Sequence, residues 1–220
     1  KDKRARFDRG EIDGDGNPTA PFGFGIWTSH TTPMLLGCPT VVMPRFTPEA
    51  ALELIERERV TMMSCVSTQF VMMLNSPALE HADLSSLRAM FTGGEAVPYK
   101  RAAEFEERTG ALVLQFYGSN ETGALSYTSV NDTRDRRLRT GGRIIEGMDV
   151  HVVDESGLAL GASDSGDGAR GQAACRGPAT CLGYYADPDA NAALITEDGL
   201  MLTGDIVTVD PDGYLRVVGR

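Results

Sequence analysis

Short apolar runs alternate with amphipathic stretches between residues 40 and 120, and this alternation constrains the fold more than any other feature of the sequence. The apolar runs have the length of buried strands, and the stretches between them place apolar side chains at helical spacing. The predicted strands are residues 60–65, 87–92 and 111–117, and two of the predicted helices are residues 68–74 and 98–109. Strands that alternate with helices at such short intervals indicate βαβ units, so we predict an α/β fold with a mostly parallel sheet here.

A further helix is predicted from its capping residues. Thr47 carries a hydroxyl that commonly caps a helix, and Pro48 suits the first helical position, where no amide hydrogen is needed. Leu52 and Ile55 follow at helical spacing, which predicts a helix of about three turns.

The pattern changes after about residue 126. Gly, Asp and Pro now separate short β-prone runs at residues 150–154, 172–176 and 206–209, which indicates antiparallel hairpins or a small barrel. Residues 161–171 are low in complexity and are expected to form a flexible loop. The predicted parts of the chain are therefore an irregular segment (residues 1–19), an α/β region (residues 20–125) and a smaller β-rich, barrel-like region (residues 126–220).

Acidic residues outnumber basic ones by 31 to 21, which gives a formal charge of −10. Nonspecific binding to nucleic acid needs clustered Lys and Arg, so we expect no nucleic-acid partner. The densest basic stretch, residues 134–139, is short and contains an Asp, and it is expected to be a solvated loop.

The cysteines and apolar segments favour a cytoplasmic setting. The four cysteines show no CxxC spacing and lie in apolar or Gly-rich segments, which is typical of buried free thiols. No stretch approaches the roughly 18 uncharged residues that a membrane span requires, and residues 1–9 are charged without a following apolar core. The chain does not begin with Met, which is compatible with a piece of a longer protein.

Three glycine-containing blocks fall at predicted strand ends, where open α/β sheets place ligands. They are residues 92–95 (TGGE), 117–123 (YGSNETG) and 202–205 (LTGD). Glycines directly after a strand let backbone amides approach a flat ring or a phosphate. Each block taken singly is explained by a tight turn, a core aromatic residue or a β-turn with Asp, so their order carries the interpretation.

The succession of blocks resembles that of the adenylate-forming superfamily of acyl-CoA synthetases, peptide-synthetase adenylation domains and luciferases. The resemblance covers residues 20–220. Its further matches are residues 21–27 (PFGFGIW), 176–178 (RGP), 183–185 (GYY), 212–215 (DGYL) and 219–220 (GR). It implies a fragment of the large N-terminal domain of an enzyme that converts a carboxylic acid to an acyl-AMP and then to a thioester.

The resemblance also implies roles for single residues. The cofactor-binding residues would be Gly93, Gly94, Glu95, Tyr117, Gly118, Asn120, Asp205 and Arg220. In this assignment Tyr117 packs against adenine and Asp205 accepts hydrogen bonds from the ribose hydroxyls. Glu121 would be the catalytic residue and would help to hold Mg²⁺, which prefers carboxylate oxygen. The acyl pocket would include Phe22, Phe24, Trp27 and Gly118. ATP, Mg²⁺ and coenzyme A are the implied cofactors.

Some positions depart from the family pattern. Asn120 stands where much of the family has a Thr that touches phosphate, and its amide can still hydrogen-bond. Residues 22–27 hold no acid to pair with a substrate ammonium, which argues against an α-amino acid and favours an aromatic, alicyclic or fatty acid. Nothing in residues 1–19 resembles the Lys-ending phosphate loop, and the small C-terminal domain with its adenylation Lys would begin where this chain ends. We therefore expect an incomplete enzyme that does not finish the reaction alone.

Three functions stay open on this evidence. The leading one is an ATP-dependent ligase that joins a small-molecule carboxylic acid to coenzyme A, as in fatty acid metabolism. A second is an adenylation domain that loads a carrier-protein thiol. The third is a noncatalytic nucleotide-binding truncation. The oligomeric state is not predicted.

Overall fold

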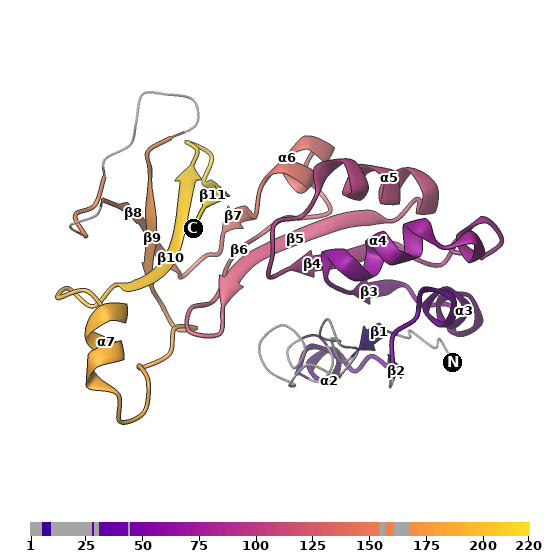
Figure 1. Ribbon diagram of the computed structural model, residues 1–220, viewed down its shortest axis with the longest axis horizontal. Helices are drawn as coiled ribbons and strands as arrows, with labels where there is room; N and C mark the ends of the chain where they lie inside the picture. The colour runs from indigo at the N-terminus through magenta and orange to yellow at the C-terminus, as the bar shows by residue number, and fades with distance from the viewer. Residues whose placement is uncertain (1–5, 10–27, 29–30, 44, 155–156, 161–167) are drawn as a thin grey trace. The chain divides into compact units, whose positions relative to one another are not determined.

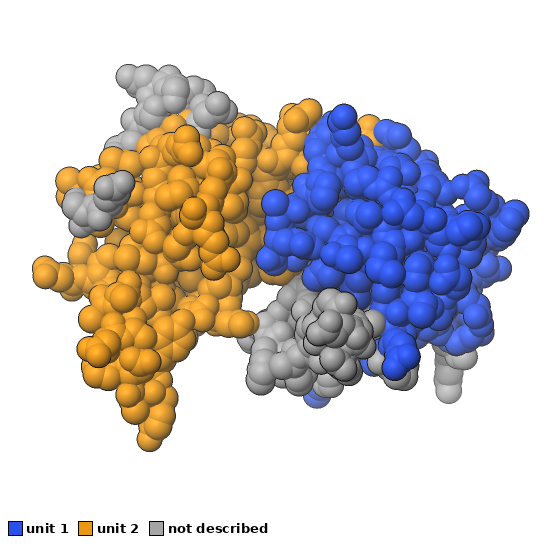
Figure 2. Space-filling view, viewed as in Figure 1, with its two compact units in different colours: residues 1–114 blue, residues 115–220 orange. Residues whose placement is uncertain are grey.

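The computed structural model describes residues 6–9, 28, 31–43, 45–154, 157–160 and 168–220. The chain forms two compact units, unit 1 (Lys1–Leu114) and unit 2 (Gln115–Arg220), which are coloured separately in Figure 2. The boundary between the units falls within one strand, β5 (Leu112–Ser119). The predicted division after residue 125 stays a prediction about domains.

Unit 1 contains a parallel sheet, as the alternation of strands and helices predicted. The strand order is β2 (Thr40–Met43), β1 (Arg6–Arg9), β3 (Met62–Ser64) and β4 (Ala89–Gly93), and these neighbours pair in parallel. Strand β1 lies within the segment that was predicted to be irregular. Strand β1 pairs with β2 and β3, which are distant in the sequence. The polar composition of β1 alone therefore did not predict a strand.

The helices of unit 1 follow their local signals. They are α2 (Thr32–Leu36), α3 (Pro48–Glu58), α4 (Ser67–Asn75), the 3-10 helix η2 (Pro77–Glu80) and α5 (Tyr99–Thr109). Thr47 caps α3 as predicted, because its Oγ1 accepts a hydrogen bond from the amide of Ala50 at 3.2 Å. Helix α4 contacts both α3 and α5, beside the strands in Figure 1. Phe70 and Phe105 meet edge to face inside this layer with ring centroids 5.8 Å apart.

Unit 2 is antiparallel and β-rich. Its strand order is β5, β6 (Gly123–Tyr127), β7 (Gly142–Ile144), β11 (Tyr214–Gly219), β10 (Met201–Val209), β9 (Arg170–Arg176) and β8 (Asp149–Val153). This order is linear, so the described strands form an open sheet and the predicted barrel does not close. Buried Leu125, Cys175 and Met201 form one core cluster, and each such apolar side chain stabilises the fold by about 1.5–3 kcal/mol.

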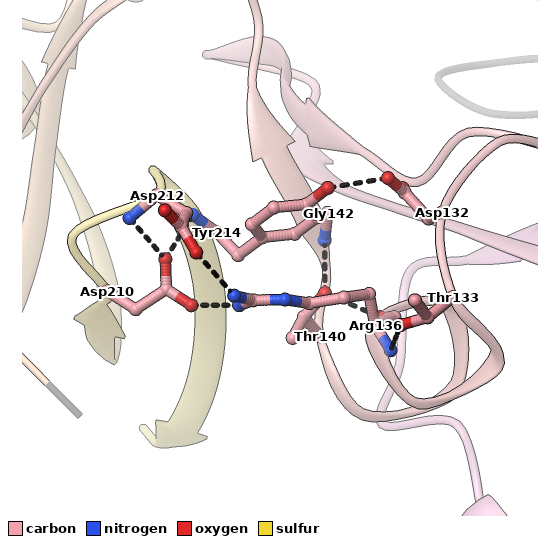
Figure 3. A network of polar contacts seen from close by, with 8 residues as sticks. All are labelled: Asp132, Thr133, Arg136, Thr140, Gly142, Asp210, Asp212 and Tyr214. Atoms are coloured by element: carbon pink, nitrogen blue, oxygen red, sulfur yellow. Dashed lines mark hydrogen bonds and ion pairs between the residues drawn. The ribbon is translucent and has the colours of Figure 1, made fainter. Parts of the chain in front are cut away.

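The basic stretch of residues 134–139 is a helix, α6 (Arg134–Arg139), and its prediction as a solvated loop was wrong. Thr133 caps it, and Arg136 reaches Asp210 and Asp212 in the turn between β10 and β11 (Figure 3). The Arg136 guanidinium also lies 4.2 Å from the centre of the Tyr214 ring. Acids more than seventy positions away in the chain therefore pair with Arg136, which a local count of charges could not show.

The remaining sequence predictions are partly met. The four cysteines are free, and Cys65 and Cys175 are buried as predicted, whereas Cys38 and Cys181 are only partly so. Burial raises the pKa of Cys175 to about 11.

Of the predicted flexible loop, residues 161–167 lie outside the described residues, and Arg170 and Gly171 belong to β9. Among the described residues, no helix is long and apolar enough to cross a membrane. The second helix of unit 2 is α7 (Pro188–Leu194).

Candidate functional site

Three of the predicted cofactor-binding residues meet in unit 2. The Tyr117 hydroxyl donates a hydrogen bond to Oδ2 of Asp205 at 2.9 Å, and Nε of Arg220 lies 3.6 Å from Oδ1 of the same carboxylate. The Asp205 side chain is 21% exposed and that of Arg220 is 85% exposed. A carboxylate oxygen can accept about two hydrogen bonds, so Asp205 keeps acceptor capacity for a ligand beside its two protein partners.

An interruption of the sheet places Asp205 there. The register of β10 against β9 shifts between Leu202 and Ile206, so the residues between them leave the regular ladder. Gly204 adopts φ +76°, which is the left-handed conformation that glycine permits. The Asp205 amide donates to Thr203 Oγ1 at 3.1 Å, and that hydroxyl donates to the carbonyl of Ala173 at 3.0 Å. The bulge thus holds Asp205 in one orientation.

Tyr117 is fixed by the core of unit 2. Its ring is partly buried and packs against two apolar clusters of the unit, those of Leu125 and Leu215. Burial raises the pKa of the Tyr117 hydroxyl, and the negative charge of Asp205 adds to the rise, so the group is a neutral hydrogen-bond donor at physiological pH.

The predicted block after Tyr117 forms a tight turn between β5 and β6. The amide of Ser119 donates to Thr122 Oγ1 at 2.9 Å, and Ser119 Oγ accepts from the amides of Glu121 and Thr122. Thr122 is almost fully buried, whereas Asn120 is exposed. The turn therefore presents Asn120 and Glu121 while its hydroxyl residues hold it closed.

Glu121 has the properties of a ligand for a hard divalent cation. Its Oε1 accepts a hydrogen bond from the Tyr184 hydroxyl at 2.9 Å. Burial works to raise the pKa of Glu121, but the hydrogen bonds from Ser119, from its own backbone and from Tyr184 outweigh it and lower the pKa, so the group is an anion at neutral pH. No group of three or more His, Cys, Asp or Glu side chains within the described part of the chain could hold a metal ion. A single carboxylate suits Mg²⁺, which is commonly bound by one or two carboxylates together with substrate phosphates.

The predicted adenine-binding block in unit 1 follows β4. Gly93 ends the strand, and Gly94 turns the chain with φ +85°. Glu95 Oε1 accepts a hydrogen bond from the amide of Ser67 at 2.9 Å, at the first position of α4. The structure thus gives Glu95 a second role that the block did not indicate, which is to satisfy an amide at a helix N-terminus.

The predicted acyl-pocket residues Phe22, Phe24 and Trp27 lie outside the described residues. Gly118 is described, and its backbone is packed too closely for a side chain, since an added Cβ would lie 2.0 Å from the Gly123 carbonyl oxygen. Tyr117, Asp205 and Arg220 are thus the predicted site residues that the structure brings together, while the acyl contacts stay a prediction.

Residues 19–185 match a family model described as AMP-binding enzyme. The chain belongs to this family. The resemblance to adenylate-forming enzymes is thereby confirmed, although the roles of single residues stay predictions.

Comparison with three known proteins shows what share of the length of its relatives this chain covers. The medium-chain fatty-acid–CoA ligase of Escherichia coli is 34% identical over 203 residues, which are 91% of this chain and 35% of that protein. The pyochelin synthase PchD of Pseudomonas aeruginosa is 39% identical over 188 residues, 85% of this chain and 33% of that protein. The structure of ATP-bound MatB from Rhodopseudomonas palustris aligns with a TM-score of 0.82 and 23% identity over 99% of this chain and 41% of that chain, which shows the shared fold. The chain spans about a third of the length of the two curated relatives.

Sequence reasoning gave no role to several residues that lie next to predicted site residues within each unit. Thr203 and Tyr184 contact predicted site residues, and both belong to motifs that the resemblance included without giving them a role. In unit 1, Thr92 Oγ1 and Ser67 Oγ are buried and have no hydrogen-bond partner among the described residues. Thr92 lies near the carboxyl end of β4, and Ser67 is the first residue of α4, which follows β3. Because an unpaired buried hydroxyl is costly, these two atoms are candidate ligand contacts. Their signal in the sequence is a hydroxyl residue near the end of an apolar strand or at the start of the helix that follows one.

Proposed function

We propose that this chain supplies the nucleotide site of an ATP-dependent carboxylic acid–CoA ligase. The observation that carries the proposal is the approach of Tyr117 and Arg220 to opposite oxygens of Asp205 in a member of the AMP-binding enzymes. Because the chain spans about a third of its relatives, the complete reaction is proposed for the whole protein and only the nucleotide contacts for this chain.

Each of the unit 2 residues would contact a different part of the bound nucleotide. The remaining lone pairs of Asp205 would accept hydrogen bonds from the ribose hydroxyls, while Arg220 and Tyr117 hold the carboxylate in place. The partly buried Tyr117 ring would pack against the adenine. Glu121 would hold Mg²⁺, which when bound offsets the charge of the phosphates.

The proposed chemistry needs positioning and charge neutralisation more than a protein nucleophile. A carboxylate oxygen of the acid bonds to the α-phosphorus of ATP as the bond to pyrophosphate breaks, which gives the acyl-AMP. The thiol of the acceptor then loses its proton to solvent, its sulfur bonds to the acyl carbon, and the bond between that carbon and AMP breaks. The protein holds the reacting groups in line and fixes polar groups where charge develops.

The substrate and the acceptor are proposed at the level of chemical class. The named substrate of the Escherichia coli relative, a medium-chain fatty acid, and the apolar residues Phe22, Phe24 and Trp27 both favour an acid with an apolar body. Coenzyme A is the favoured acceptor. The similar identity to a pyochelin synthase supports a second candidate, in which a carrier-protein thiol accepts the acyl group. Supplying the whole protein with ATP, Mg²⁺, a fatty or ring-bearing acid, and either coenzyme A or a thiol-bearing carrier protein distinguishes the two by which thioester forms.

Replacement of Asp205 by Ala tests the nucleotide site in this chain. Loss of the charge-assisted hydrogen bonds is expected to weaken ATP binding by roughly 10- to 100-fold, which corresponds to about 1.5–3 kcal/mol. Calorimetric titration with ATP and Mg²⁺ measures the effect, and circular dichroism checks that the variant is folded. Asp189→Ala is the matched control, since Asp189 is an exposed aspartate in the first turn of α7 and should leave ATP affinity unchanged.

Three outcomes would count against the proposed nucleotide site or the proposed ligase. Equal ATP affinity of Asp205→Ala and the parent chain would remove Asp205 from the site. Absence of ATP binding by the parent chain would count against both the ligase and a noncatalytic nucleotide-binding role. Binding by the chain without acyl-AMP formation by the whole protein would leave the noncatalytic role as the better description.

A further inference from the structure

A segment that follows β9 covers the turn that carries Glu121. The Cys181 amide donates to the carbonyl oxygen of Glu121 at 2.7 Å. A Cβ on Gly123 would lie 2.7 Å from Cβ of Ala179, so only glycine at this position lets the segment approach so closely. Residues 177–185, here called the covering segment, therefore pack directly on the turn between β5 and β6. Helix α7 follows the segment at the same end of unit 2 (Figure 1).

The covering segment ends in a tyrosine whose hydroxyl reaches the proposed metal ligand. Tyr184 donates to Oε1 of Glu121 at 2.9 Å. This bond takes one of about four acceptor positions of the carboxylate, which leaves the others for a cation. The Tyr184 side chain is half-exposed, so the bond adds little to the packing of the core.

Helix α7 fixes the backbone of Tyr184 through the side chain of Asn191. Asn191 Oδ1 accepts from the Tyr184 amide at 2.6 Å, and Asn191 Nδ2 donates to the Tyr184 carbonyl at 2.9 Å. Gly183 has φ +128°, and an added Cβ there would lie 2.7 Å from Asn191 Oδ1. Asp187 caps α7 by accepting from the amide of Ala190 at 3.0 Å, so the helix that presents Asn191 is itself fixed at its start.

We propose that Tyr184 is a positioning residue, whose hydroxyl orients the Glu121 carboxylate toward a divalent cation and which Asn191 holds in place through its backbone. The proposal rests on the proposed function, in which Glu121 helps to hold Mg²⁺ beside the phosphates of ATP. Groups that hydrogen-bond to a metal-binding carboxylate fix its direction, and their loss commonly lowers metal affinity by about 10- to 100-fold. A residue with a merely structural role would not affect the metal selectively.

The test compares ATP affinity in EDTA with ATP affinity in Mg²⁺ by calorimetry on the whole 220-residue chain. The ratio of the two affinities measures the coupling between cation and nucleotide. Tyr184→Phe removes only the hydroxyl, and we expect it to reduce this ratio by roughly 10-fold while affinity in EDTA stays unchanged. Asn191→Ala should reduce the ratio in the same direction. Tyr185→Phe is the matched control, because the adjacent Tyr185 is fully exposed and should change neither affinity.

A double-mutant cycle with Glu121→Gln shows whether Tyr184 acts through Glu121. If it does, Tyr184→Phe has no further effect on the ratio in the Glu121→Gln background. An unchanged ratio in Tyr184→Phe, or an equal further loss in the Glu121→Gln background, overturns the positioning role. ATP affinity of the parent that does not respond to Mg²⁺ overturns it as well. Absence of ATP binding by the parent in either buffer is a different result, since it defeats the proposed function and the positioning role falls with it.

Discussion

Gly118 is a residue at which the local geometry leaves no room for a side chain. A Cβ at this position would lie 2.0 Å from the carbonyl oxygen of Gly123 and 2.9 Å from the Cα of Ala124, both on the facing strand of the hairpin. These are backbone atoms, so they cannot rotate away. We expect Gly118→Ala to lower the free energy of unfolding by about 1–3 kcal/mol through overpacking, measured as a lower midpoint in thermal or denaturant unfolding.

Gly219→Ala is the control for this replacement. Its added Cβ would meet the Ile206 side chain at an ordinary 3.7 Å, and Gly219 does not have a positive φ. The control should therefore unfold close to the parent. A Gly118→Ala variant as stable as Gly219→Ala would contradict the packing of the turn between β5 and β6.

Helix α6 is joined to the turn between β10 and β11 by the ion pairs of Arg136 with Asp210 and Asp212. Burial acts to raise the pKa of Asp210, but hydrogen bonds from the Tyr214 amide and from Arg136 lower it overall. A carboxyl whose pKa is lowered by folding stabilises the fold above its unfolded pKa, near 3.9, and this contribution is lost as the pH falls through the lower folded value.

Arg136→Gln tests this tie. It should lower the free energy of unfolding by about 1–2 kcal/mol at neutral pH, because the pair is only partly shielded from solvent. Calorimetry across pH should show the difference from the parent shrinking below about pH 4. Arg57→Gln is the control, since its exposed pair with Glu53 on α3 is expected to contribute less than about 0.5 kcal/mol. A pH-independent difference between Arg136→Gln and the parent would mean that Asp210 is not the group involved.

For the molecule as a whole, the sequence predicted the features that depend on neighbours along the chain. The cap at Thr47, strands β3 and β4 and helices α3, α4 and α5 were located to within about two residues, because periodicity and capping are local. Helix α2 and strand β2 were not predicted, and neither were strand β1 and helix α6, which depend on partners far away in the chain. The same holds for the candidate site. The glycine turns could be predicted from the sequence, but Tyr117 and Asp205 are 88 positions apart, and only the family resemblance assigned them to one site.

The net charge of the whole molecule leads to a last prediction, which concerns nucleic acid. The formal charge of −10 repels a polyanion, and Arg136 in the densest basic stretch is already paired with Asp210 and Asp212. We expect no binding of fluorescently labelled duplex DNA in anisotropy titrations even at roughly 50 mM salt, where counterion release favours binding most. An Asp210→Asn, Asp212→Asn variant releases Arg136 and still leaves the chain acidic, so it should also fail to bind. DNA binding by the parent that weakens steeply with salt would show that local basic groups outweigh the total charge, and the excluded class of partner would have to be reconsidered.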